Sequence, residues 1–253
     1  MNVTEKTWGK YLSRLRRLND RAAQLVARYL AEHTIETYDE RQALIEFANA
    51  IVQRYGAGSA ALAAEMYDAI VDLSDVALPA AVPASVPTIG EVAKAVNGTL
   101  KTGNPEIVSS AVGRLVKMAG VDTTLQNAIR DRAQFAWIPH GDTCAFCIAL
   151  AANGWQTASA DALKGGHAEH VHSNCDCTYA IRFSPKDEYM FYRPEKYRAM
   201  YDGAEGQSST DKINAMRRAF YQKNKDEIAK QKKAAREIRK ELNAPAAEEI
   251  NVN

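Results

Sequence analysis

Two stretches, DTCAFCIALAANGW at residues 142–155 and HVHSNCDCTYAIRF at residues 170–183, hold all four cysteines of the 253-residue chain. Within the second stretch, residues 178–183 alternate large side chains with Ala180 and Arg182, which is the pattern of a short strand. The first two-thirds of the chain instead repeats its apolar residues at helical spacing. The sequence therefore predicts an α+β protein that is mainly α-helical, with short strands in the Cys/His stretch.

The spacing of the cysteines is typical of a metal site. A Cys-x-x-Cys turn can place two thiolates on one metal, and a second pair of ligands from a distant loop completes a tetrahedron. Zinc suits mixed thiolate and imidazole ligands and needs no redox chemistry. We expect a structural zinc site with Cys144, Cys147, His172 and Cys175 as the preferred ligands, and Cys177 as the replacement if His172 is not a ligand.

Other uses of these residues stay open. The cysteines could form disulfides in an assembled extracellular particle, whereas a thioredoxin-like motif is disfavoured because no βαβ pattern surrounds Cys144. His167 and Glu169 have the H-x-E spacing of zinc deaminases, but the P-C-x-x-C that should follow is absent. His170, His172 and Asn174 could form a nuclease cluster, for which no ββα pattern is present. A metal with four protein ligands has no open position for water, so we expect no enzyme.

The part of the sequence that precedes Cys144 contains clear signals for helices and for the segments between them. Residues 78–87, LPAAVPASVP, carry three prolines and predict an extended linker or a strap across a surface. Thr88 and Glu91 have the spacing of a capping box, which predicts the start of the next helix. The apolar face of the first helix consists of Trp8, Leu12, Leu15, Leu18, Leu25, Tyr29 and Leu30.

Glycines predict the ends of two further helices. Asp39 begins a capping-box pattern, and its helix is expected to stop at Gly56, before a separate Ala-rich helix. Pro105 predicts a helix N-terminus whose helix ends near Gly120, with Asp122 capping another segment. The expected parts are an N-terminal helical region (1–78), a Pro/Ala linker (79–88), a second helical region (89–135), a Cys/His zinc-binding module (136–183), an aromatic loop arm (184–210), and a charged C-terminal helix with its tail (211–253).

The formal net charge of +1 conceals a segregation of charge. Residues 1–30 hold seven Lys/Arg and two Asp/Glu, residues 211–242 hold eleven and five, and residues 31–210 hold fourteen and twenty-two. Basic ends can indicate contact with a polyanion or an acidic partner, although solvated helix faces are equally common. No run of about 18 apolar residues occurs, so we expect no membrane contact. The charged N-terminus disfavours a secretory signal and favours cytoplasmic synthesis.

The cysteine-bearing stretches resemble the C-x-x-C…H-x-x-C-x-C block of phage minor capsid proteins in the MuF-like head-morphogenesis group. The sequences YGAGSAALAAEMYD at residues 55–68 and EYMFYRPEKYRAMYD at residues 188–202 are also similar to segments of that group. The resemblance spans about residues 1–205. Ser173 stands where many relatives have proline and Asp176 where arginine is frequent, and neither difference removes a ligand.

The resemblance implies a structural protein of the virion interior, made in the host cytoplasm and associated with the portal protein or the major capsid protein. Such a protein acts in head assembly, DNA packaging or ejection. Basic terminal helices could bind packaged DNA through its phosphates. The rival hypotheses are a phage-encoded metal-dependent nuclease or other DNA-processing enzyme that uses the His/Cys cluster, and a plain zinc-stabilised binding module.

Overall fold

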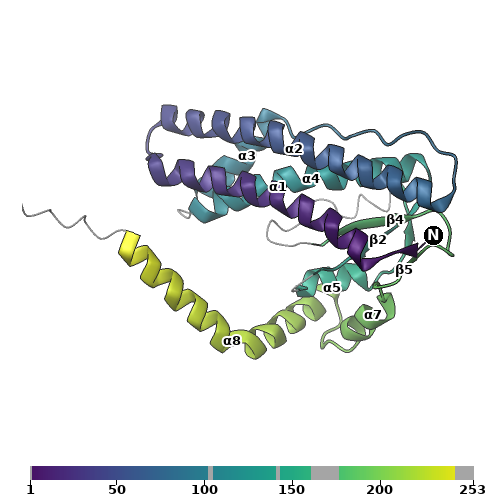
Figure 1. Ribbon diagram of the computed structural model, residues 1–253. Coiled ribbons are helices and arrows are strands. Elements are labelled where there is room, and N and C mark those ends of the chain that lie inside the picture. Colours follow the sequence, from purple (N-terminus) through teal and green to yellow (C-terminus); the bar gives the residue numbers. More distant parts are fainter. Residues whose placement is uncertain (1, 102–104, 141–142, 161–176, 243–253) are drawn as a thin grey trace, which may run out of the picture. The chain divides into compact units, whose positions relative to one another are not determined.

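The computed structural model describes residues 2–101, 105–140, 143–160 and 177–242 (Figure 1). The chain forms two compact units, Met1–Met200 and Tyr201–Asn253. Helices make up most of the described chain, and the strands are short. The architecture is therefore the mainly α-helical α+β fold that the sequence predicts.

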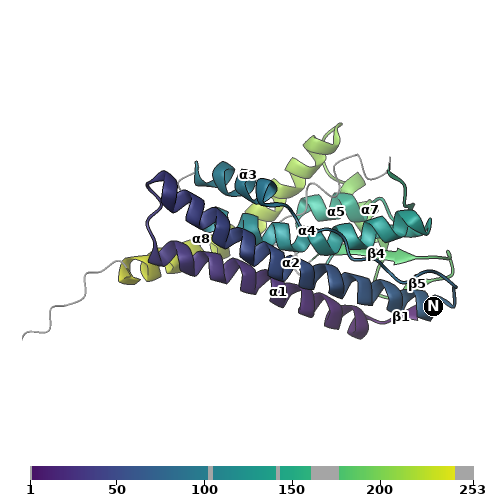
Figure 2. The same cartoon turned by 90° about the horizontal axis from the view of Figure 1, so that it is seen from above.

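Four helices form the body of the first unit: α1 (Glu5–Glu32), α2 (Tyr38–Ser74), α3 (Ile89–Leu100) and α4 (Pro105–Arg130). Helix α2 packs against each of the other three, and α1 and α2 lie side by side along their length (Figures 1 and 2). Helix α4 contributes Val108, Val112 and Val116, all fully buried. Their spacing of four residues places one valine per turn on the core face of α4.

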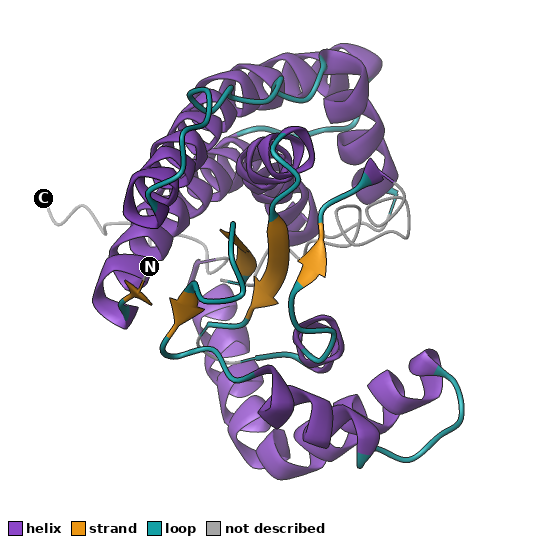
Figure 3. Ribbon diagram, turned by 90° about the vertical axis from the view of Figure 1, so that its right-hand side faces the viewer, coloured by secondary structure: helices purple, strands orange, loops and turns teal. Residues whose placement is uncertain are grey.

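A small antiparallel sheet follows the helical body (Figure 3). Its strands are β2 (Gln134–Ile138), β3 (Gln156–Thr157) and β4 (Thr178–Arg182), in the spatial order β3-β2-β4, with helix α5 (Ala145–Ala151) between β2 and β3 in the chain. Strand β4 packs against α4 and α2. The strand expected at residues 178–183 is confirmed, and one hydrophobic core joins the sheet to the helices.

The N-terminus pairs with the aromatic segment that follows the sheet. Strand β1 (Asn2–Val3) is parallel to β5 (Glu188–Tyr189), and helix α7 (Pro194–Asp202) comes next in the chain. The Trp8 and Tyr189 rings meet edge to face with centroids 5.5 Å apart. The Tyr189 hydroxyl donates a hydrogen bond to the carbonyl oxygen of Ile181 in β4 at 2.8 Å. Residues expected to form a loop arm therefore contain a strand and a helix.

The proline-rich segment between α2 and α3 is the predicted strap. Asn127 of α4 binds both polar groups of Val82, because its Oδ1 accepts from Val82 N at 2.9 Å and its Nδ2 donates to Val82 O at 2.8 Å. Proline lacks an N–H donor, so the strap cannot form a regular β-ladder. Side chains of the helices instead form hydrogen bonds with its backbone N–H and carbonyl groups. The other strap bonds run from Ala81 N to Asp68 Oδ1, from Ala84 N to Thr123 Oγ1, and from the Arg130 guanidinium to the carbonyl oxygens of Pro79 and Ala80.

Two capping boxes fix the starts of α2 and α3. The box predicted at Thr88 and Glu91 is confirmed, since Thr88 N donates to Glu91 Oε2 at 2.7 Å. The box expected from Asp39 is wrong, because Thr37 is the N-cap of α2 and donates through its N–H to Glu40 Oε2 at 2.8 Å. Hydrogen bonds to the carboxylate, led by the one from the Thr37 backbone, lower the pKa of Glu40 to about 2.

The glycines that were expected to end helices lie inside them. Helix α2 continues through Gly56, and α4 continues through Gly120 and past Asp122. A Cβ atom on Gly56 would collide with Val86 of the strap, and one on Gly120 would lie 2.6 Å from Ser59 Oγ. The expectation is wrong because these glycines permit close packing instead of a change of backbone direction.

The second unit contains the charged helix α8 (Ser209–Leu242), which confirms the helix expected from Asp211. The Asp211 N–H donates to Ser208 Oγ at 3.1 Å, and Ser208 N donates back to Asp211 Oδ2 at 3.1 Å. The predicted tail, residues 243–253, lies outside the described residues. Across the ranges that the structure describes, no helix has both the length and the apolar character needed to cross a membrane.

The contact between α2 and α4 can be tested with Gly120→Ala. The added methyl would also lie 3.1 Å from the Ser59 carbonyl oxygen, so the helices must separate, at an expected cost of about 2 kcal/mol in the free energy of unfolding. Gly98→Ala in α3 is the matched control, since no atom lies within 4 Å of its added Cβ. That control should stabilise the protein slightly. Equal melting temperatures for the two variants would contradict the close-packing role of Gly120.

Asp122 predicts an unusual pH dependence of stability. Burial, and after it the Glu91 carboxylate, raise the pKa of Asp122 from 3.8 to about 6. The folded state therefore holds this proton more tightly than the unfolded state, so the contribution of Asp122 becomes less favourable as pH rises from about 4 to 6. Asp122→Asn should stabilise the protein by about 1 kcal/mol at pH 8, discounted for partial exposure, and by much less at pH 4.5. Thermal melts at both pH values test this, and an equal gain at both would refute it.

Candidate metal centre

Cys144 lies at the start of α5. It is the N-cap residue, with extended backbone angles (φ −73°, ψ 160°), and its side chain is partly buried. The Cys144 Sγ accepts a hydrogen bond from Cys147 N at 3.4 Å. Metal-bound thiolates commonly accept such backbone N–H bonds. The first half of the Cys-x-x-Cys motif thus forms a turn that directs a backbone donor at the first sulfur.

Cys147 is buried one helical turn further on, in the core that joins the sheet and the helices. Burial, and after it the charge of Cys147, raise the pKa of the neighbouring Tyr179 above its ordinary value of 10. The Tyr179 hydroxyl and the Trp137 indole N–H are buried and form no hydrogen bond with the described residues. Their rings meet edge to face at 4.7 Å. The Tyr179 hydroxyl is therefore a buried donor close enough to Cys147 to respond to its charge, and donors near a thiolate stabilise it.

Cys177 lies immediately before β4 and is fully buried. Its Sγ accepts a hydrogen bond from His140 N at 3.4 Å. This contact follows from the strand register, because Ile138 of β2 is paired with Thr178 of β4. His140 and Cys177 lie just beyond that pair, at the same end of the two strands. Burial, and after it the charge of Cys177, raise the pKa of Tyr197.

The β2–β4 pairing therefore sets the position of Cys177 beside the end of β2. The chain leaves β2 at Ile138 and reaches Cys144 six residues later, while Cys177 enters β4 at the same end. Cys144, Cys147 and Cys177 all contact one hydrophobic core. The other two candidate ligands, His172 and Cys175, lie outside the described residues, as do His167, Glu169, His170 and Asn174.

The complete ligand set remains a prediction. Among the residues that the structure describes, no group of three or more His, Cys, Asp or Glu side chains is arranged to hold a metal ion. Two of the three described sulfurs accept backbone N–H bonds, and the Cys177 thiol also donates to the carbonyl oxygen of His140 at 4.0 Å. Two donors buried nearby have no described acceptor.

Sequence reasoning missed β2, the strand that positions the centre. Its sequence QFAWI holds two aromatic residues and an isoleucine directly before Pro139, and this composition is a strand signal. The preceding turn at Arg132 has a positive φ of 53°, which separates the strand from α4. The contribution of His140 through its backbone N–H has no signal in the sequence, because any residue except proline supplies that donor.

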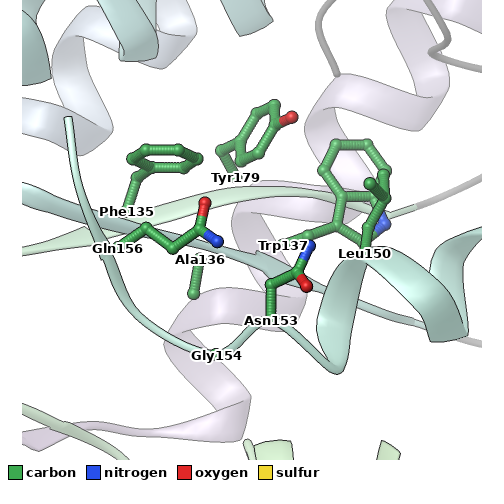
Figure 4. A pocket seen from close by; sticks show the side chains of 8 residues that line it. All are labelled: Phe135, Ala136, Trp137, Leu150, Asn153, Gly154, Gln156 and Tyr179. Carbon is green, nitrogen blue, oxygen red and sulfur yellow. The ribbon is translucent and has the colours of Figure 1, made fainter. Parts of the chain in front are cut away.

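A small cavity lies beside the sheet, between β2 and the end of α5 (Figure 4). It measures about 10 Å³, which is enough for about one water molecule and too little for a substrate. The side chains that line it are mostly apolar or amide groups. They belong to Phe135, Ala136, Trp137, Leu150, Asn153, Gly154, Gln156 and Tyr179.

Comparison with known proteins assigns the chain to a family. No curated protein and no solved structure matches it. A family model described as VG15 protein matches residues 2–204, a range that takes in the helical body, the sheet and all four cysteines, and ends before α8. Since the match covers well over half of the sequence, the chain belongs to the VG15 protein family, a family of viral proteins.

Proposed function

We propose that this viral protein is a structural minor capsid protein of a tailed phage. In this proposal it lies inside the head, contacts the portal protein or the major capsid protein, and acts in head assembly, DNA packaging or ejection. The observation that carries the proposal is the cysteine block, whose sequence resembles the MuF-like block and whose Cys177 directly precedes β4, where its sulfur accepts the His140 N–H.

The proposed zinc has a structural role. Cys144, Cys147 and Cys175 would supply three ligands, with His172 or Cys177 as the fourth. When bound, zinc would cross-link the loop that carries Cys144 and Cys147 to the loop that carries Cys175. It would also contribute directly to the free energy of folding. The chain's own contribution is to hold the two loops at the end of one buried sheet, with backbone donors directed at two of the sulfurs.

A structural role also suits the surroundings of the cysteines. The cavity next to β2 is too small for a substrate, and the aromatic residues around it form packed ring contacts. A metal with four protein ligands lacks the open position that hydrolytic zinc enzymes use to activate water. We therefore propose a structural protein in preference to a nuclease.

Cys144→Ser tests the centre. Loss of one thiolate should abolish stoichiometric zinc binding and lower the melting temperature by several degrees, since a structural zinc contributes folding free energy. Ala149→Ser in the same helix is the matched control, because it adds a hydroxyl without removing sulfur. Metal analysis paired with a thiol count gives the result. Unchanged zinc content in Cys144→Ser would refute the ligand set.

The fourth ligand can be identified by comparing His172→Ala with Cys177→Ser. The variant that removes a true ligand should lose zinc, while the other should keep it. Cys177 is fully buried, so Cys177→Ser can lower stability even when it is not a ligand. Zinc content, measured on folded protein at low temperature, is therefore the deciding readout.

The capsid assignment predicts that the protein co-purifies with heads or portals at low copy number and shows no turnover. Quantitative mass spectrometry of purified particles, with a host cytoplasmic protein as the contamination control, tests it. Absence from particles would overturn the assignment. Metal-dependent DNA cleavage that is lost in His170→Ala would replace it with the nuclease hypothesis.

A further inference from the structure

One face of α1 carries a continuous row of cationic side chains. Lys10, Arg14, Arg17, Arg21 and Arg28 recur at helical spacing, with Gln24 completing the row, and all are exposed. Residues three and four apart are neighbours on a helix surface. At about 1.5 Å per residue the row is about 27 Å long. We call these five cations the α1 basic row.

Among the described residues, a carboxylate forms an ion pair with only one cation of the α1 basic row. Arg14 pairs with Glu65 of α2 at 3.1 Å, in an exposed ion pair. Within the described parts of the chain, no carboxylate forms an ion pair with Lys10, Arg17, Arg21 or Arg28. The Arg14–Glu65 pair and the proximity of Gly58 to Leu18 show that residues 47–64 of α2 run beside α1. That stretch of α2 contains no Asp or Glu.

We propose that the α1 basic row is a binding surface for the phosphate backbone of duplex DNA. Arginine guanidinium groups match phosphate geometry through paired N–H donors, and four of the five cations are arginines. The first four cations are successive neighbours with Cβ atoms about 5 to 6 Å apart, and Arg28 lies two turns beyond Arg21 on the same face. A straight row of this kind suits a regularly charged polymer. The proposal depends on the proposed function in one respect: a protein inside the head lies near packaged DNA.

The opposite face of α1 is not available for insertion into a bilayer. A helix that binds a membrane surface must insert its apolar face between lipids. The apolar face of α1 is instead buried in the protein, with Trp8, Leu12 and Val26 at most 4% exposed. Only the charged face is available, so the partner must be recognised by charge.

The test measures binding of the purified full chain to 25-base-pair duplexes of two unrelated sequences, by fluorescence anisotropy between 50 and 300 mM salt. Five phosphate contacts by the α1 basic row contribute about −4.5 to the slope of log affinity against log salt, before any contribution from the basic helix α8, with no sequence preference. The variant Arg17→Ala/Arg21→Ala/Arg28→Ala should make the slope shallower by about 2.7 and weaken binding at 100 mM salt by tenfold or more.

The matched control is Arg41→Ala/Lys94→Ala/Lys101→Ala, which removes the same charge from α2, from α3 and from the C-cap residue of α3. It should bind nearly as well as the unaltered chain, and circular dichroism should show that both variants fold. Equal loss in the two variants would mean that net charge alone drives binding and would overturn the proposal. So would the absence of DNA binding at 50 mM salt.

A partner of a different class gives a distinct result. If the α1 variant binds DNA normally but no longer associates with portals or capsids, the row is a protein interface and the proposal is wrong. Failure of the proposed function can be told apart from failure of the DNA surface. If the protein is absent from purified heads, DNA binding by the isolated chain can still be measured and judged by itself. Presence in heads with salt-insensitive DNA binding would reject only the DNA surface.

Discussion

The close contact between α2 and α4 is the constraint on which the rest of the first unit depends. Gly120 of α4 lies against Ser59 of α2, where even one methyl group would not fit without movement. Helix α4 then leads into β2 within four residues, and Ala133 bonds to both sides of the junction, since its N–H donates to Ala128 O and its carbonyl accepts from Ala158 N. The position of α4 against α2 therefore also sets the position of the sheet and of the cysteines at its end.

The same coupling extends to the start of the chain. Val3 and Trp8 are buried against the segment that follows β4, and the Tyr189 hydroxyl binds the β4 backbone. The first residues of the region matched by the family model are thus packed beside the segment that follows β4. A change in the cysteine loops should be transmitted to α1 and α2 through this shared core, because closely packed interiors transmit strain. A metal that fixes those loops would then stabilise the whole unit and not the loops alone.

Local signals in the sequence predict local structure well. The Thr88 capping box, the proline strap and the strand at residue 178 each depend on neighbouring residues, and each is confirmed. Gly56 and Gly120 mislead because a glycine that ends a helix and one that admits a neighbour are identical in sequence. Their difference lies in Val86 and Ser59, which are distant along the chain.

The sequence predicts the local part of the candidate site and misses the part that depends on distant segments. The Cys-x-x-Cys spacing predicts that Cys144 and Cys147 act together, and the structure joins them through a backbone N–H to the first sulfur. The position of Cys177 beside His140 depends on β2, which the sequence reading missed. Ligands from separate loops are brought together by strand register, and register is a property of pairing between distant segments.

Helix α1 shows why net charge is a poor guide to the partners of this protein. Its inner face is fixed in the core by Trp8, Leu12 and Val26, so the outer face keeps one orientation. Cations on a rigid helix lose less conformational freedom on binding than cations on a flexible segment, and their spacing is set before contact. The surplus charge of this face is cancelled in the total by acidic residues elsewhere, yet screening at physiological salt limits such cancellation to about 8 Å. The local field of α1 is therefore set mainly by its own row and by the acid-free stretch of α2 beside it.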